Sequence, residues 1–191
     1  MIIKKNILKY SEILTFHGSF NKTNDKANIL LLLPKTRGPF GVTKFKKLIE
    51  KKFNLLEYDD VQTENSNIFN HFEIITFEDK ALAVNHALTK WGNVNFHIVC
   101  HSTGCGLGTF LAKYNENCKS LILISPWNKK DDDFRLLQKK RVKNARTLDS
   151  TSFLKSEYKL LYSTNYLEKF KKEFCNYILM HKNKKIDYSF I

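Results

Sequence analysis

The chain has 191 residues, 42% of them hydrophobic and 13% aromatic, which is enough apolar surface to bury the core of one ordinary domain. Its formal net charge is +13. Only four of the basic residues are arginines, and the lysines are spread along the whole chain. This pattern favours a solvated basic surface over a nucleic-acid interface, so we expect no nucleic-acid partner.

The N-terminal apolar stretch is too short and too charged for a signal peptide, and no window approaches the roughly 20 apolar residues of a membrane-spanning helix. We therefore expect a cytoplasmic protein without a membrane partner. The cysteines form no C-x-x-C pair and no zinc spacing, and each lies in or beside an apolar run, which predicts buried free thiols and neither metal nor cofactor. They are Cys100, Cys105, Cys118 and Cys175.

Strand-like segments are spaced along the first two thirds of the chain. Those over residues 27–35 and 119–125 are continuous apolar runs of the kind that a sheet buries on both faces. The remaining predicted strands cover residues 11–20, 54–60 and 95–100.

Helices are predicted between these strands. One follows Thr43 as its N-cap, and a second runs over residues 79–91, closed by Gly92. A third follows residue 102 and keeps Leu107 and Leu111 on one face. Residues 62–70 lack periodicity and are expected to form a loop. The alternation predicts parallel strands joined by right-handed crossovers, in a three-layer α/β domain.

One serine stands where a predicted strand meets a predicted helix. The residues Cys100-His101-Ser102-Thr103-Gly104 have small side chains two before and two after the serine. A strand-to-helix turn this sharp has no room for larger ones, and it lifts the serine hydroxyl clear of the sheet. The amides that begin the next helix point at the same place, ready to hold a developing oxyanion. The sequence therefore predicts a nucleophile elbow at Ser102.

At these residues the sequence resembles the α/β-hydrolase superfamily, and more narrowly the branch that includes 3-oxoadipate enol-lactonase and aminoacrylate hydrolase. The resemblance covers almost the whole chain but only about the first two thirds of the family domain. It rests on the segments ILLLLPKTRG, YDDVQTENS, FEDKALAVNHAL, HIVCHSTGCGLG and SLILISPW, and it extends into DDDFRLLQKKRV and EYKLLYSTNYLEKF.

The resemblance implies an α/β-hydrolase fold, three-layered with a mostly parallel sheet and a helical cap segment, shortened at its C-terminus. Residues 1–127 are expected to form the core, 128–184 the cap-like segment and 185–191 a returning strand. The implied activity is that of a serine hydrolase in which Ser102 attacks an ester, a lactone or a similar carbonyl. No particular substrate is implied.

The sequence departs from the family pattern in two places. Pro34-Lys35 stand where the family usually has His-Gly, so the amides of Thr36 and Thr103 are the matching oxyanion donors. In addition, the family's catalytic Asp and His follow strands that come after the cap, whereas this chain ends in KIDYSFI.

His181 is the only late histidine and is the candidate base within this chain. Asp131, Asp132 and Asp133 follow the strand after the elbow, where some hydrolases carry the acid, but we favour a solvated run that caps the next helix. Other histidines fit ordinary roles better: a strand position for His97, a solvated helix position for His86, a loop for His71, a place behind the strand for His101 and a hairpin turn with Gly18 for His17.

Aromatic residues in the cap segment could line an acyl pocket, but their helical spacing favours ordinary packing against the sheet. They are Tyr158, Tyr162, Tyr166, Phe170 and Phe174. Two hypotheses follow: a serine hydrolase, or a shortened hydrolase-like protein that acts as a binding module or needs a partner. A sheet that ends early leaves an unpaired edge, so we also expect a homodimer through that edge, or a partner chain that covers it.

Overall fold

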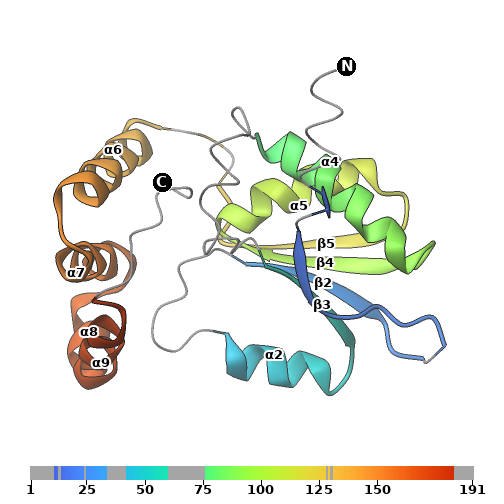
Figure 1. The fold of residues 1–191 in the computed structure, drawn as a ribbon, viewed down its shortest axis with the longest axis horizontal. Helices are drawn as coiled ribbons and strands as arrows, with labels where there is room; N and C mark the ends of the chain where they lie inside the picture. Colours follow the sequence, from blue (N-terminus) through green and yellow to red (C-terminus); the bar gives the residue numbers. More distant parts are fainter. Residues whose placement is uncertain are drawn as a thin grey trace. The chain divides into compact units, whose positions relative to one another are not determined.

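The computed structural model describes residues 11–12, 14–23, 25–33, 42–59, 76–127, 129 and 131–182. The chain divides into two compact units. The first unit comprises Met1–Lys35 and Val42–Trp127, and the second comprises Thr36–Gly41 and Asn128–Ile191. Figure 1 shows the chain with its helices and strands labelled.

The first unit is built on a five-stranded sheet within the described residues, in the order β1-β3-β2-β4-β5. Strand β1 pairs antiparallel with β3, and all other pairs are parallel. This confirms the predicted parallel sheet. The strands are β1 (Thr15–Gly18), β2 (Asn28–Leu32), β3 (Asn54–Asp59), β4 (Phe96–His101) and β5 (Cys118–Ile124).

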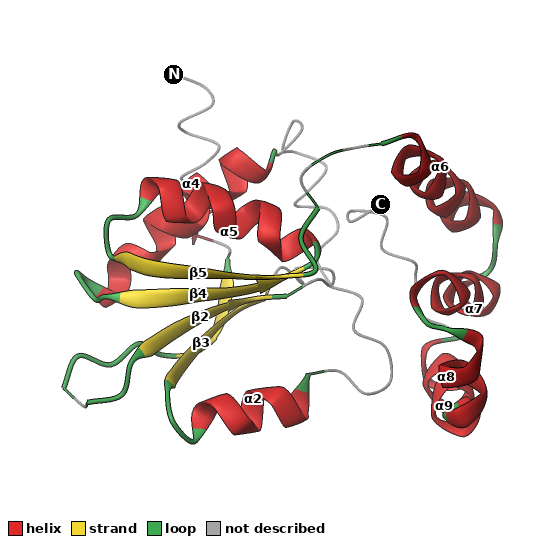
Figure 2. Cartoon of the chain, turned by 180° about the vertical axis from the view of Figure 1, so that it is seen from behind, coloured by secondary structure: helices red, strands yellow, loops and turns green. Residues whose placement is uncertain are grey.

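Helices cover both faces of this sheet. Helices α4 (Phe77–Leu88) and α5 (Thr103–Tyr114) lie on one face and α2 (Thr43–Glu50) lies on the other, as Figures 1 and 2 show. A short 3₁₀ turn, η1 (Thr89–Trp91), extends α4 and ends at Gly92, whose φ is 67°. The predicted closure of this helix by Gly92 is therefore confirmed.

The core of the first unit lies on both sides of β2, all of whose residues are buried. Leu30 and Leu32 join the cluster under α4 and α5, and Leu31 joins a smaller cluster under α2. The apolar run over residues 27–35 therefore predicted a central strand correctly. The run over residues 119–125 was also a strand, but it does not lie inside the sheet: within the described residues β5 is an edge strand, and most of its residues are exposed.

Two local predictions were wrong. His17 and Gly18 do not form a hairpin turn, because β1 pairs with β3 instead of β2. Gly18 has a φ of 90°, and a Cβ there would lie 2.1 Å from the carbonyl oxygen of Leu55, so glycine is required by the approach of the two strands. Thr43 is the first residue of α2 and not its N-cap, which is Val42.

The second unit contains four helices within the described residues: α6 (Asp132–Thr147), α7 (Ser150–Leu161), α8 (Thr164–Lys169) and α9 (Lys171–His181). Tyr158, Phe174 and Ile178 form its buried cluster. Phe170 separates α8 from α9 and is the C-cap of the first and the N-cap of the second. Across the described ranges, no helix has both the length and the apolar character needed to cross a bilayer.

The cysteines are all free, but only two of them are buried. Cys100 and Cys105 are buried, Cys118 is half-buried and Cys175 is exposed. The prediction of buried thiols was wrong for Cys175 because helix α9 turns that side chain outward, although its neighbour Phe174 is buried. Position along a helix, rather than the apolar character of the segment, decides burial here.

Candidate active site

Ser102 lies in a one-residue turn between β4 and α5. Its φ of 52° and ψ of −119° are values that residues with a side chain rarely adopt. The turn is tied on both sides: the Ser102 amide donates to the carbonyl oxygen of Ile124 at 3.0 Å, and the Ser102 carbonyl accepts from the amide of Cys105 at 3.0 Å. The serine predicted at the junction of strand and helix is therefore found there, at the carboxyl end of the sheet.

The residues two before and two after this serine are small because both positions are tightly packed. A Cβ on Gly104 would lie 2.4 Å from the backbone oxygen of Leu32, so α5 can only begin this close to β2 without a side chain at that position. Cys100, two residues before the serine, is completely buried. The predicted steric requirement on both sides of Ser102 is thus met by contacts to the neighbouring strand and helix.

Two thiols lie beneath the turn. The thiol of Cys100 donates to the carbonyl of Ile122 at 3.3 Å, and that of Cys105 donates to the carbonyl of Ile124 at 3.5 Å. Burial, together with the interaction with Cys105, raises the pKa of Cys100 to about 12. The Cys100 thiol is therefore protonated at neutral pH and is a structural side chain, not a nucleophile.

Strand β5 brings a second serine next to the first. His101 and Ile124 are paired in the register of β4 and β5, so Ser102 and Ser125 follow the last pair side by side. Ser125 also has a positive φ, 49°. Two residues later, Trp127 packs against Phe77 of α4, with their ring centroids 6.1 Å apart.

Ser125 was not predicted from the sequence. Only the pairing of β5 with β4 places it beside Ser102, and no local pattern signals that register. The dipeptide Ser-Pro after a strand was the one available sign that the chain turns there.

No protein-family model matches the sequence, and no curated protein matches it. Solved structures do match. An α/β hydrolase enzyme from a Medee basin deep-sea metagenome library, MGS-M2, has a TM-score of 0.70 and 14% identity, covering 90% of this chain and 64% of that one. The enol-lactonase from Burkholderia xenovorans LB400 has a TM-score of 0.65 and 15% identity, over 90% and 65% of the two chains. The chain has the α/β-hydrolase fold.

MenH from S. aureus gives a similar match, with a TM-score of 0.64 and 16% identity over 90% of this chain and 67% of that one. The chain thus spans about two thirds of the length of these solved chains. At such identities the likeness establishes the fold alone.

Of the two predicted oxyanion donors, one lies within the described part of the α/β-hydrolase fold. Thr103 is the first residue of α5, where backbone amides have no acceptor inside the helix. Thr36 lies outside the described residues, as do His71, the predicted loop over residues 62–70 and the predicted strand over 185–191.

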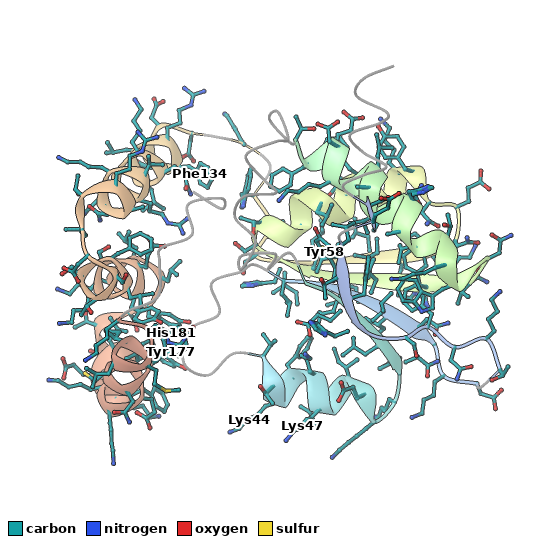
Figure 3. All side chains as sticks on the ribbon, viewed as in Figure 1. Lys44, Lys47, Tyr58, Phe134, Tyr177 and His181 are labelled. Carbon is teal, nitrogen blue, oxygen red and sulfur yellow. The ribbon has the colours of Figure 1, made fainter. Side chains whose placement is uncertain are left out.

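His181 ends α9 in the second unit. Its Nδ1 lies 2.7 Å from the carbonyl oxygen of Tyr177, and its ring stacks on that of Tyr177 with centroids 4.0 Å apart, as the labelled side chains in Figure 3 indicate. Because a carbonyl oxygen only accepts, Nδ1 carries a proton and donates it to this bond, so in the neutral imidazole the lone pair is on Nε2. The neutral form of His181 therefore has the tautomer that a general base requires.

Among the residues that the structure describes, no side chain is hydrogen-bonded to the hydroxyl of Ser102. The other histidines have ordinary surroundings. His97 contacts the hydroxyl of Ser120 at 2.8 Å, and His86 is exposed on α4, as predicted. His17 lies on β1, and His101 is the half-buried last residue of β4.

The acidic run after β5 caps a helix, as we favoured. The Asp131 side chain accepts from the amide of Phe134 at 2.8 Å and is the N-cap of α6, with Asp132 and Asp133 in the first turn.

The aromatic residues of the second unit pack against one another. Tyr158 contacts Phe174 with ring centroids 4.8 Å apart, and the cluster contains residues of α7, α8 and α9 and the Phe170 between them, so the predicted packing against the sheet is replaced by packing between helices of the second unit.

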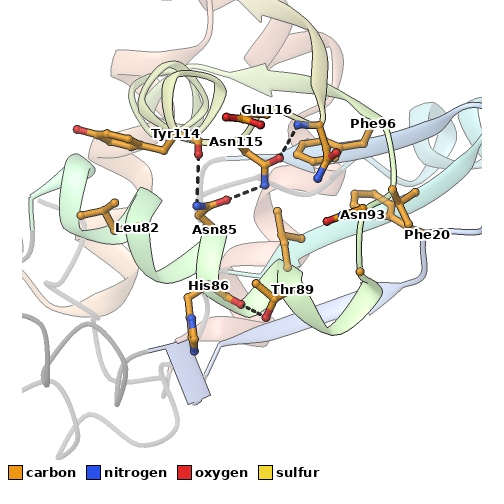
Figure 4. A pocket seen from close by; sticks show the side chains of 14 residues that line it. Phe20, Leu82, Asn85, His86, Thr89, Asn93, Phe96, Tyr114, Asn115 and Glu116 are labelled. Carbon is orange, nitrogen blue, oxygen red and sulfur yellow. Dashed lines mark hydrogen bonds between the residues drawn. The ribbon is translucent and has the colours of Figure 1, made fainter.

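A hollow of about 380 Å³ lies at the opposite end of β4 from Ser102 (Figure 4). It is lined by Phe96, which begins β4, and by Asn85 and Asn115, whose amides bond to each other at 2.6 Å. Because it lies at the other end of β4, it is distinct from the candidate site. No cluster of three metal-ligating side chains occurs in the described ranges.

Proposed function

We propose that the protein is a serine hydrolase of the α/β-hydrolase type that acts on an ester, a lactone or a similar carbonyl substrate. The observation that supports this most directly is the backbone of Ser102, a positive-φ serine between a parallel strand and a helix, in the α/β-hydrolase fold. A serine in such a nucleophile elbow presents its hydroxyl at the top of the sheet, where a carbonyl carbon is accessible to it.

Catalysis would begin with attack of the Ser102 hydroxyl oxygen on the substrate carbonyl. The negative charge that develops on the carbonyl oxygen would be held by the amide of Thr103, which starts α5, and by that of Thr36. The dipole of the twelve-residue helix α5 adds positive potential at the same place. Collapse of this intermediate would expel the alcohol and leave an acyl group on Ser102, which water then removes.

The proton of Ser102 needs a base. We assign this role to His181, or to residues beyond this chain, because the bond from Nδ1 to the Tyr177 carbonyl leaves Nε2 free to accept a proton. The assignment requires Nε2 to reach the Ser102 hydroxyl during turnover. The helices α6–α9 would then serve as the cap of a cytoplasmic enzyme.

The alternative is a hydrolase-like protein without turnover that acts as a binding module. Its support is that no described side chain bonds to the Ser102 hydroxyl. In either case we propose a homodimer through the edge of β5, where Ile122, Leu123 and Ile124 are 51%, 43% and 39% exposed.

A fluorophosphonate probe separates the two functions, because it reacts with activated serines. We expect covalent labelling of the full chain at Ser102, located by peptide mass spectrometry, and its loss in Ser102→Ala. His181→Gln should reduce the labelling rate at least a hundredfold if His181 is the base, since general-base assistance contributes about 10²–10⁴-fold. His86→Gln, an exposed histidine on α4, is the matched control and should label normally.

Folded protein that remains unlabelled would contradict the hydrolase proposal and support the binding module. Labelling that His181→Gln leaves unchanged would keep the hydrolase and move the base to another residue.

A further inference from the structure

Two residues other than glycine have a positive φ in the described part of the chain, and they are neighbours in space. Ser102 and Ser125 follow the last residues of the adjacent parallel strands β4 and β5, with φ values of 52° and 49°. The 3.0 Å bond from the Ser102 amide to the Ile124 carbonyl joins the two strand ends directly. The carboxyl edge of the sheet therefore carries a pair of adjacent serines with unfavourable backbone conformations.

Such a conformation costs free energy for any residue with a Cβ, and glycine avoids the cost. This chain uses glycine at its other described positive-φ positions, Gly18 and Gly92. At Ser102 the proposed nucleophile explains why a side chain is kept in spite of the strain. The positive φ of Ser125 needs a similar explanation, because backbone strain of this kind is concentrated at residues whose side chains have a function.

The fold itself does not supply that reason. Ser125 is exposed, and its hydroxyl has no hydrogen-bond partner among the described residues. The turn alone would be served equally well by glycine. What remains is a hydroxyl that bonds to no described residue, one position after the end of β5 and beside Ser102, with Trp127 of the Phe77–Trp127 aromatic pair two residues later.

We propose that Ser125 is a substrate-binding residue. Its hydroxyl donates a hydrogen bond to an oxygen of the ester or lactone that Ser102 attacks. This inference rests on the proposed hydrolase function and adds to it a contact from β5. It also implies that the substrate places a hydrogen-bond acceptor over the carboxyl end of β5, beside the reacting carbonyl.

Two substitutions at this position separate binding from strain. Ser125→Ala removes the hydroxyl and keeps the strained Cβ, whereas Ser125→Gly removes both. We expect each to lower kcat/KM for p-nitrophenyl acetate about tenfold, the effect of one lost hydrogen bond, after subtraction of the Ser102→Ala background. The melting temperature should rise by about 2 to 4 °C in Ser125→Gly and stay unchanged in Ser125→Ala. Ser125→Asn, which tolerates positive φ and keeps a donor, should recover part of the activity.

The outcomes distinguish this inference from the function on which it rests. Wild-type activity with unchanged kinetics in both variants would overturn the role of Ser125 and leave the hydrolase in place. A loss in Ser125→Ala that is absent in Ser125→Gly would also overturn it, because both variants lack the hydroxyl and the second would be active without it. Wild-type protein that neither hydrolyses the ester nor labels with a fluorophosphonate would overturn the function, and this inference with it.

Discussion

Gly104 shows how a single missing side chain sets the position of the candidate nucleophile. A Cβ there would lie 2.4 Å from the oxygen of Leu32 and 2.9 Å from its carbonyl carbon. Both are backbone atoms of the central strand β2, which is buried along its whole length and has no room to move. Helix α5 would have to shift away from the sheet, and Ser102 would move with it.

Gly104→Ala should therefore lower the free energy of unfolding by about 3 kcal/mol, as overpacking of a rigid site does. Gly106→Ala is the matched control. Its Cβ would meet the ring of Phe77 at 3.0 Å, which is a side chain that can yield, and the gain in helix propensity of about 1 kcal/mol offsets the remaining strain. Urea denaturation followed by circular dichroism measures both variants. Equal losses at the two positions would contradict this account.

At the scale of single residues, the sequence predicted correctly those features that depend on a few neighbouring residues. Ser102 and its small neighbours form a contiguous pattern, so the turn was predicted correctly. The sequence showed nothing comparable for Ser125, because its place beside Ser102 depends on strand pairing and its positive φ depends on the path of the chain after β5. The tautomer of His181 likewise depends on a helix that brings the Tyr177 carbonyl within 2.7 Å.

Helices α6 and α7 are joined by a buried ion pair. The guanidinium of Arg141 bonds to both carboxylate oxygens of Glu157, with Nη2 at 2.6 Å from Oε2 and Nε at 3.1 Å from Oε1. The side chains are only 13% and 1% exposed. A buried bidentate pair of this kind fixes how two helices meet, because neither charge is solvated if the other is removed.

Arg141→Met should destabilise the protein by about 3 to 5 kcal/mol, because it leaves the Glu157 carboxylate buried and alone. Lys171→Met breaks the exposed pair with Glu168, whose side chains are 70% and 67% exposed, and should cost less than about 1 kcal/mol. The double variant Arg141→Met/Glu157→Met should recover much of the loss. Thermal unfolding monitored at 222 nm reports all three, and a double variant no better than Arg141→Met would show that the helices depend on more than this pair.

At the scale of elements, it was easier to predict whether a segment forms a helix or a strand than to predict which strands pair with each other. The periodicities around β2, β4, α4 and α5 identified each element correctly. Pairing partners were harder: β1 was assigned to a hairpin but pairs with β3, and β5 was expected inside the sheet but lies at its edge. An apolar run is compatible with a strand inside the sheet and with a strand at its edge. The sequence of the run shows that the strand can be buried, but it does not show which strands lie beside it.

At the scale of the whole molecule, the outer side of β5 is not paired with any strand among the described residues. In a parallel ladder the backbone groups of alternate residues point to opposite sides. Since the carbonyl of Ile124 accepts from Ser102, those of Leu121 and Leu123 face the open side. Two copies of β5 aligned antiparallel about Leu123 would set Ile122 against Ile124 of the partner subunit, so the edge complements itself without opposing charges.

We therefore predict a dimer by light scattering coupled to size exclusion, one that strengthens with salt, because two chains of net charge +13 repel each other. Leu123→Lys should give monomers. Leu161→Lys adds the same charge at a residue of α7 that is 52% exposed, and should leave the dimer intact. A wild-type monomer at all concentrations would refute the prediction. A monomer that dimerises only after residues 185–191 are deleted would assign this edge to the chain's own C-terminus.

Strand β5 also governs how the protein behaves in concentrated solution. Residues 121–124 are four consecutive apolar side chains with high β-propensity and no charge, the composition of segments that nucleate amyloid-like stacking. Lys119 precedes this run and Pro126 follows it, and both residue types act as gatekeepers that block further strand addition. The two flanking residues thus limit precipitation while the three exposed side chains between them stay available for specific association.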